Sequence, residues 1–97
     1  MLRIRAEESP EVLTLRLEGK LVSPWVEELV RCWRMELERL PVRRQVRINL
    51  DAVSFVDGHG VTALTALHLN GCELRGSGVF IAAVLEEITT QRRNLRA

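Results

Sequence analysis

Four short stretches of the chain alternate apolar with polar residues, and each is apolar on one side only. They cover residues 2–6, 13–17, 46–50 and 72–75. A period of two residues is typical of a β-strand with one buried face and one solvated face. Strands of a sheet that is covered on both faces are apolar throughout. The sequence therefore predicts a two-layer domain, in which helices cover one face of a sheet and water meets the other.

The segments between these stretches carry helical signals. Ser23 and Pro24 predict an N-cap and a first helical residue for a helix that Pro41 ends, and apolar residues are spaced along one face of that segment. A second helix is expected to follow residues 57–60 and to end at Gly71, because glycine commonly terminates helices.

The last segment predicts a third helix, capped by Ser77 and ending near Thr90, beyond which residues 91–97 are expected to fray. The order is then strand, strand, helix, strand, helix, strand, helix. A short loop predicts an antiparallel first pair, whereas helical crossovers require parallel pairing. We expect a single α/β domain over residues 1–97: a two-layer, four-stranded mixed sheet with three helices packed on one face.

The charge balance limits the classes of partner. Lys and Arg number 14 against 13 for Asp and Glu, a net charge of +1, whereas nucleic-acid binders normally carry a larger basic excess. No apolar run approaches the ~20 residues that cross a bilayer, and residues 1–5 alternate apolar and basic, unlike a signal peptide. Cys32 and Cys72 are too few for a disulfide scaffold. We expect a cytoplasmic domain that neither binds nucleic acid nor inserts into a membrane.

Three segments, taken with the order of elements, resemble a known family over nearly the whole chain. They are residues 15–21, residues 48–60 with the sequence INLDAVSFVDGHG, and residues 67–77. The middle segment is similar to the pattern of STAS domains: a hydrophobic strand, Asp, an aliphatic residue, Phe, an aliphatic residue, Asp, two small residues and Gly. Anti-sigma factor antagonists and the cytoplasmic domains of sulfate transporters have this fold.

The resemblance implies a regulatory function in signal transduction. In the family, a partner kinase, the anti-sigma factor, binds the unmodified domain and releases it after phosphorylating a Ser or Thr. The pattern matches its Asp to Asp57, its two small residues to Gly58 and His59, and its Gly to Gly60, which places His59 at the phosphoacceptor position. The resemblance therefore implies a non-catalytic, protein-binding antagonist that is not switched by phosphorylation at the usual site.

A second observation, independent of the resemblance, concerns charge. Residues 58–72 contain no Asp, Glu, Lys or Arg, in a chain that is 28% charged. A solvated helix face normally carries charge, whereas charged side chains are depleted at protein interfaces. We therefore expect a partner-binding surface here, unless the helix is short and mostly buried. The residues expected in this surface are Asp57, Gly58, His59, Gly60, Thr62, Thr65, Ala66 and Leu69.

Several residues leave alternatives open. Asp57 can act as a helix N-cap or can also hold the loop for a partner or a phosphoryl group. His59 is expected at the helix tip, where it touches solvent or a partner, because phosphohistidine chemistry needs a base and a phosphodonor. Ser54, Thr62 and Thr65 are hydroxyl groups near the loop and are candidates for a displaced phosphorylation site.

Two other functions stay open beside the anti-sigma antagonist. One is a STAS subunit of an ABC-type lipid transport complex, whose partner is the transporter's ATPase subunit. The other is an enzyme or phosphocarrier built on His59. The chain offers no nucleophile–base pair and no cofactor loop, and His59 and His68 lie about half a turn out of phase at 100° per residue. We therefore expect no catalytic residues, no cofactor and no metal. The sequence indicates neither the partner's identity nor the oligomeric state.

Overall fold

Strands and helices follow one another in the predicted order. The computed structural model describes residues 1–39 and 45–96. The elements are β1 (Leu2–Glu8), β2 (Val12–Leu21), α1 (Trp25–Arg39), β3 (Gln45–Val56), α2 (Gly58–Leu69), β4 (Glu73–Arg75) and α3 (Val79–Arg96).

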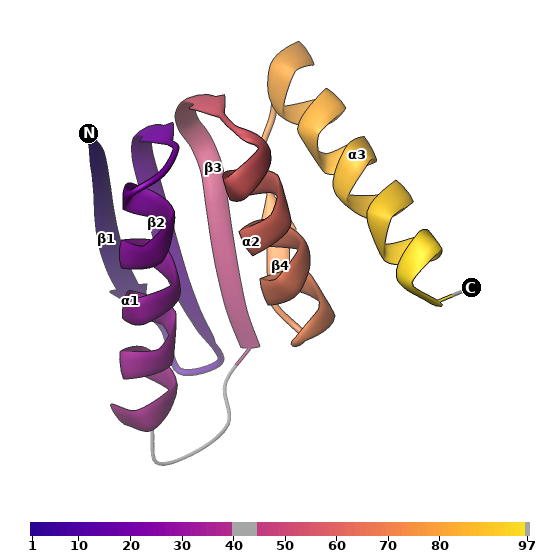
Figure 1. Ribbon diagram of the computed structural model, residues 1–97. Coiled ribbons are helices and arrows are strands. Elements are labelled where there is room, and N and C mark those ends of the chain that lie inside the picture. Colours follow the sequence, from indigo (N-terminus) through magenta and orange to yellow (C-terminus); the bar gives the residue numbers. More distant parts are fainter. Residues whose placement is uncertain (40–44, 97) are drawn as a thin grey trace.

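The sheet has the predicted mixed pairing. Its strand order is β1-β2-β3-β4. β1 pairs antiparallel with β2, and both the β2–β3 and the β3–β4 pairs are parallel. The helices lie on one side of the sheet: α1 covers the β1–β2 half, α2 the β3–β4 half, and α3 packs beside α2 (Figure 1). The predicted fold class, a four-stranded mixed sheet with three helices, is thereby confirmed.

The core lies between this sheet and the helices. The largest fully buried side chains are Leu13, Leu15, Leu17, Leu21, Leu29, Ile48, Leu50, Leu64, Leu67 and Ile88. Half of them occupy the apolar positions of the alternating stretches, because every second strand residue faces the helices. Burial of these aliphatic side chains is the main favourable contribution to folding.

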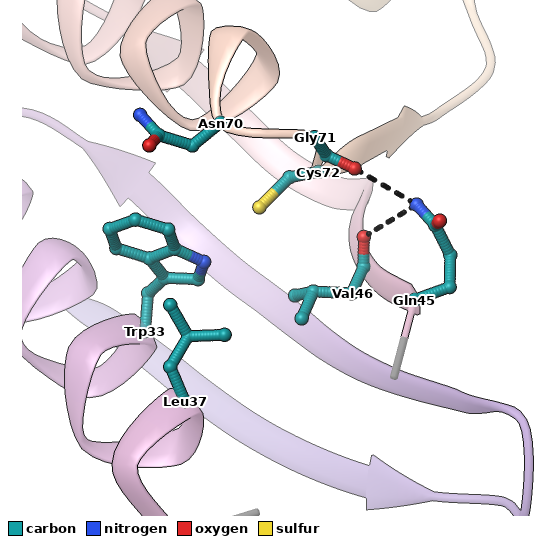
Figure 2. A pocket seen from close by; sticks show the side chains of 7 residues that line it. All are labelled: Trp33, Leu37, Gln45, Val46, Asn70, Gly71 and Cys72. Carbon is teal, nitrogen blue, oxygen red and sulfur yellow. Dashed lines mark hydrogen bonds between the residues drawn. The ribbon is translucent and has the colours of Figure 1, made fainter. Parts of the chain in front are cut away.

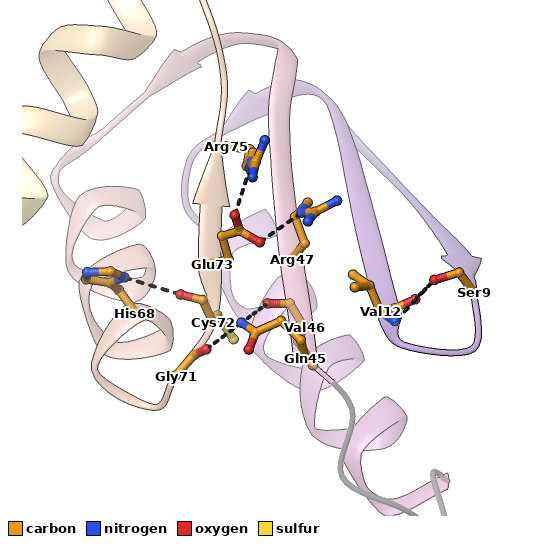
Figure 3. Close-up of polar contacts among 10 residues, drawn as sticks. All are labelled: Ser9, Val12, Gln45, Val46, Arg47, His68, Gly71, Cys72, Glu73 and Arg75. Atoms are coloured by element: carbon orange, nitrogen blue, oxygen red, sulfur yellow. Dashed lines mark hydrogen bonds and ion pairs between the residues drawn. The ribbon is translucent and has the colours of Figure 1, made fainter.

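The opposite face of the sheet carries charged residues that pair across strands, as the alternation predicts. Glu73 of β4 lies between Arg47 of β3, at 2.9 Å, and Arg75, at 2.7 Å (Figure 3). Further along the sheet, Arg16 contacts Glu7. This face therefore carries solvated ion pairs.

Several predicted boundaries differ from the structure. α1 begins at Trp25, one residue after Pro24, and its predicted end at Pro41 lies outside the described residues. β3 continues to Val56, six residues beyond the alternating stretch, because a register shift lets it stay paired with β2. α3 continues to Arg96, so the end expected near Thr90 is too early.

Ser77 does not cap α3. Its amide and its hydroxyl both donate to Asp51 Oδ1, at 2.9 and 3.0 Å, and the helix begins two residues later. The prediction failed because Gly78, whose carbonyl accepts the Ala82 amide, occupies the position directly before the helix, and Ser77 is bound instead to Asp51, a strand residue distant in sequence.

Candidate functional site

Asp57 joins two segments at the strand-carboxyl end of the sheet. It is the N-cap of α2, and its Oδ1 accepts the amide proton of Gly60 at 2.8 Å. Its Oδ2 accepts the amide proton of Ser23 at 3.1 Å, and its own amide donates to the Leu21 carbonyl at 3.2 Å. The predicted capping role is confirmed. The contact with Ser23 was missed, because only the folded chain brings the end of β2 beside the start of α2.

These amides also fix the charge of Asp57. The hydrogen bond from the Gly60 amide is the largest influence, and with the bond from Ser23 and the nearby His59 it lowers the pKa of the Asp57 carboxyl, against the opposing effect of desolvation. Hydrogen bonds to a carboxylate favour its ionised form. Asp57 is therefore a negative charge held against a helix N-terminus, where the helix dipole also favours it.

The two glycines after Asp57 have different surroundings. A Cβ on Gly60 would lie 2.6 Å from the Leu21 carbonyl oxygen and 2.7 Å from Val56 Cγ1, so no larger residue fits without movement. Gly58 is exposed, and a Cβ there would meet nothing within 4 Å. Gly60 thus allows α2 to approach the sheet, whereas the position of Gly58 is open to solvent or a partner.

The exposed part of α2 is a narrow stripe. We use the name α2 stripe for His59, Thr62, Ala66 and Leu69, which are all exposed and recur at helical spacing. Leu69, with 45% of its surface exposed, is the largest apolar side chain among them. No charged residue interrupts the stripe, as the sequence predicted.

Thr65 does not belong to this surface, and the expectation that it faces solvent is wrong. Only 3% of its surface is exposed, and its hydroxyl donates to the Val61 carbonyl at 2.8 Å. α2 has neighbours on both flanks, α1 and α3, so its buried arc is wider than that of a helix with one covered face. Gly60 is buried as well and contacts no solvent.

The two other candidate hydroxyls are exposed. Thr62 Oγ1 donates to the Gly58 carbonyl at 3.0 Å, within α2, and Ser54 Oγ donates to the Gly19 carbonyl at 3.2 Å, between β3 and β2. Burial therefore removes Thr65 from the phosphorylation candidates of the sequence and leaves Ser54 and Thr62.

The two histidines have separate surroundings. His59 is exposed in the first turn of α2. His68 is half-buried in the last turn, where its Nδ1 lies 3.2 Å from the Cys72 carbonyl oxygen (Figure 3). Among residues 1–39 and 45–96, no three His, Cys, Asp or Glu side chains are grouped so that they could hold a metal ion.

A pocket lies at the other end of α2, far from Asp57 along the helix. Its volume is about 370 Å³, and its lining includes Trp33 and Leu37 of α1 with Cys72 after α2 (Figure 2). Gln45 closes one side, where its amide donates to the Gly71 carbonyl at 3.0 Å. Burial raises the pKa of the Cys72 thiol to about 11, so this pocket offers no reactive thiolate at neutral pH.

One exposed aromatic contact was not predicted. The rings of Phe55 in β3 and Phe80 in α3 are stacked, with centroids 6.3 Å apart and planes inclined by 13°, and both side chains remain exposed. The two residues belong to different elements, and no local pattern connects them.

No helix of the described part of the chain is long and apolar enough to cross a membrane.

Comparisons with known proteins agree with this geometry. The family model described as STAS domain matches residues 3–95. An antisigma-factor antagonist STAS domain from Rhodobacter sphaeroides superposes with a TM-score of 0.56 at 23% identity, covering 79% of this chain and 86% of that one. An uncharacterized DUF3478 protein with a SpoIIAA-like fold from Shewanella loihica PV-4 gives a TM-score of 0.57 at 18% identity, covering 99% and 79%. At these identities the two structures show a shared fold. A comparison with curated protein sequences found no match.

Proposed function

The chain belongs to the STAS domain family, and we propose that it is a non-catalytic interaction module which, like an anti-sigma factor antagonist, binds a regulatory protein in the cytoplasm. The α2 stripe is the proposed binding surface, together with Gly58, the first residue of α2, and Asp57, the N-cap directly before it.

The uncharged, exposed character of the α2 stripe carries this proposal. His59, Thr62, Ala66 and Leu69 face solvent on a helix whose other residues are largely buried. Short uncharged side chains lose little hydration when a partner covers them, and a half-exposed leucine gains from being covered. Asp57 holds the first turn of α2 in place through the Gly60 amide, so the stripe is presented by a fixed helix.

Control by phosphorylation at the usual site is not part of the proposal. Neither Gly58 nor His59, the two residues that follow Asp57, has a hydroxyl group. We propose that abundance of the protein, or competition for its partner, sets how much complex forms.

A capture experiment tests the proposal. The wild-type domain and Leu69→Asp are immobilised and exposed to native extract. We expect the wild type to retain an anti-sigma factor or a related kinase-like regulator and Leu69→Asp to lose it. Burying a carboxylate in a dry interface costs more free energy than its new contacts return. Val79→Asp, which changes an exposed apolar residue outside the α2 stripe, is the matched control and should retain the regulator.

The same experiment separates the other functions. Retention of a transporter ATPase would assign the chain to an ABC-type lipid transport complex and contradict the proposed partner class. If His59→Ala removed a catalytic turnover while partner affinity stayed unchanged, the non-catalytic assignment would be wrong.

A further inference from the structure

The outer edge of β1 is a strand edge with no neighbour. β1 pairs with β2 along one side, from Leu2–Gly19 to Glu8–Leu13, and no described strand pairs with its other side. The strand is seven residues long and contains neither proline nor a register shift. Such edges can pair with another strand unless they are shortened, bent or covered.

The register identifies the backbone groups on this edge. Opposed residues in an antiparallel ladder alternate between pairs that exchange hydrogen bonds and pairs that do not. The Lys20 amide donates to the Met1 carbonyl, so in the same register Arg3, Arg5 and Glu7 direct their backbone groups at β2. Ile4 and Ala6 direct theirs away from β2, to the outer edge.

The charges along β1 favour one kind of occupant. The first half of the strand has Arg3 and Arg5, and the second half has Glu7 and Glu8. A second copy of β1 laid antiparallel beside the first brings its acidic half against the basic half. A parallel copy brings like charges together, which is unfavourable for directly opposed residues. In addition, the Arg5 side chain has no ion pair or hydrogen bond among the described residues.

The free backbone groups and the charges together select a register. Any antiparallel register with its two-fold axis at a residue of β1 aligns the outward-directed groups. An axis at Ile4 sets Arg3 against Arg5, and an axis at Glu7 sets two glutamates against each other. A two-fold axis at Arg5 places two Arg5 side chains opposite each other. An axis at Ala6 instead places Arg5 opposite Glu7 of the second copy, twice. These pairs exchange no backbone hydrogen bonds, and in such pairs the side chains lie closer together. Ala6 then exchanges hydrogen bonds with its own equivalent.

α1 extends the same edge above the sheet. Arg39, in the last turn of α1, pairs with Glu8 of β1, so this flank of α1 lies toward β1. Met35 lies one turn earlier on that flank. Its side chain is 61% exposed, which is a large exposed fraction for an apolar residue. α1 lies over β1 and β2 (Figure 1), and strands are about 4.8 Å apart. Two α1 helices related by the axis would thus be neighbours on the same face of the joined sheet.

We propose that this protein forms a homodimer in which the β1 strands of two copies pair antiparallel about an axis at Ala6, joining two sheets into one of eight strands. Backbone hydrogen bonds about the axis and two Arg5–Glu7 ion pairs hold the strands, and Met35 of each copy packs across the axis. The α2 stripe lies on a different helix and stays accessible in the dimer.

Charge exchange across the axis tests this dimer. Arg5→Glu sets the introduced glutamate against Glu7 of the second copy, and Glu7→Arg sets two arginines together. We expect the full-length wild type to sediment as a dimer, and each variant alone to show a dissociation constant raised by about tenfold or more. An equimolar mixture of the two variants should dimerise again, because every opposed pair is then of opposite charge.

The two variants also distinguish the registers, and the mixture guards against misfolding. With an axis at Arg5, Arg5→Glu alone would dimerise like the wild type, because it exchanges one like-charge pair for another and leaves both Arg3–Glu7 pairs intact. Glu87→Arg, an exposed charge reversal on α3, is the matched control and should dimerise like the wild type. A wild type that stays monomeric up to about 1 mM, or single variants that dimerise like the wild type, would overturn the proposal.

Discussion

The carboxylate of Asp57 accepts the amide proton of Ser23, a residue 34 positions earlier in the chain, at 3.1 Å. The same carboxylate accepts the Gly60 amide at the start of α2. One side chain therefore connects the end of β2 to the helix that carries the α2 stripe. The first turn of that helix is fixed by two contacts, one local and one distant.

The first prediction concerns Asp57→Asn. An asparagine can accept from one amide, but its NH₂ group then faces the other, so we expect a lower urea midpoint at neutral pH. The pKa of Asp57 is lowered from its ordinary 3.8 in the folded state. Its stabilising contribution is therefore complete above the unfolded-state pKa and is lost as the pH falls through the folded-state pKa.

The difference in urea midpoint between wild type and Asp57→Asn should consequently shrink as the pH falls below 3.8. Other carboxylates titrate alike in both proteins and cancel in the difference. Glu87→Gln, at an exposed carboxylate on α3, is the control and should change little at any pH. A difference that is equally large in acid would show that the charge of Asp57 is not what stabilises the loop.

The second prediction compares the two glycines of the loop. Gly60→Ala forces a Cβ to within 2.6 Å of the Leu21 carbonyl oxygen, and we expect it to destabilise the domain by about 1–3 kcal/mol. Gly58→Ala, in open space, should be neutral or stabilise by up to ~1 kcal/mol because alanine favours the helix. Equal effects in thermal unfolding would contradict the close approach of α2 to the sheet.

The third prediction concerns phosphorylation. When the purified domain is incubated with the captured kinase-like regulator and ATP, we expect its intact mass to stay unchanged. Thr62 is the exposed hydroxyl of the α2 stripe, but its oxygen already donates to the Gly58 carbonyl within the helix. An added phosphate that disappears in Thr62→Ala would place a displaced switch at that residue and contradict the proposed mode of control.

The fourth prediction concerns the buried cysteine. With a pKa of about 11, Cys72 is thiolate in only about one molecule in a thousand at pH 8. We expect iodoacetamide to modify native Cys72 far more slowly than the same residue in urea, as peptide mass spectrometry can measure. Equal rates would show that the Cys72 thiol is neither buried nor shifted in its pKa.

The sequence predicted most of the fold because the information is local. Alternation places Leu13, Leu15 and Leu17 on one face, and the Asp-Gly-His-Gly segment marks a helix start. The failures depend on contacts between distant segments. Ser77 bonds to Asp51, and Thr65 is covered because α2 has a helix on each flank. Helical periodicity separates two faces of a helix, but it does not give the width of the buried one.

The candidate site could likewise be predicted only in part from the sequence. The absence of charge over residues 58–72 is visible in the sequence and holds for the exposed stripe. The roles of Gly58 and Gly60 could not be told apart, since both are glycines in one turn and only the position of Leu21 distinguishes them. The free edge of β1 likewise requires the strand order, which shows that β1 has one neighbour.

The most direct test of the α2 stripe is an amide NMR titration of the ¹⁵N-labelled domain with the captured regulator. We expect the largest shift changes at His59, Thr62, Ala66 and Leu69, and small ones at Arg16 and Arg47 on the open face of the sheet. Changes centred on those sheet residues, with the helix signals unmoved, would contradict the proposal that α2 presents the binding surface.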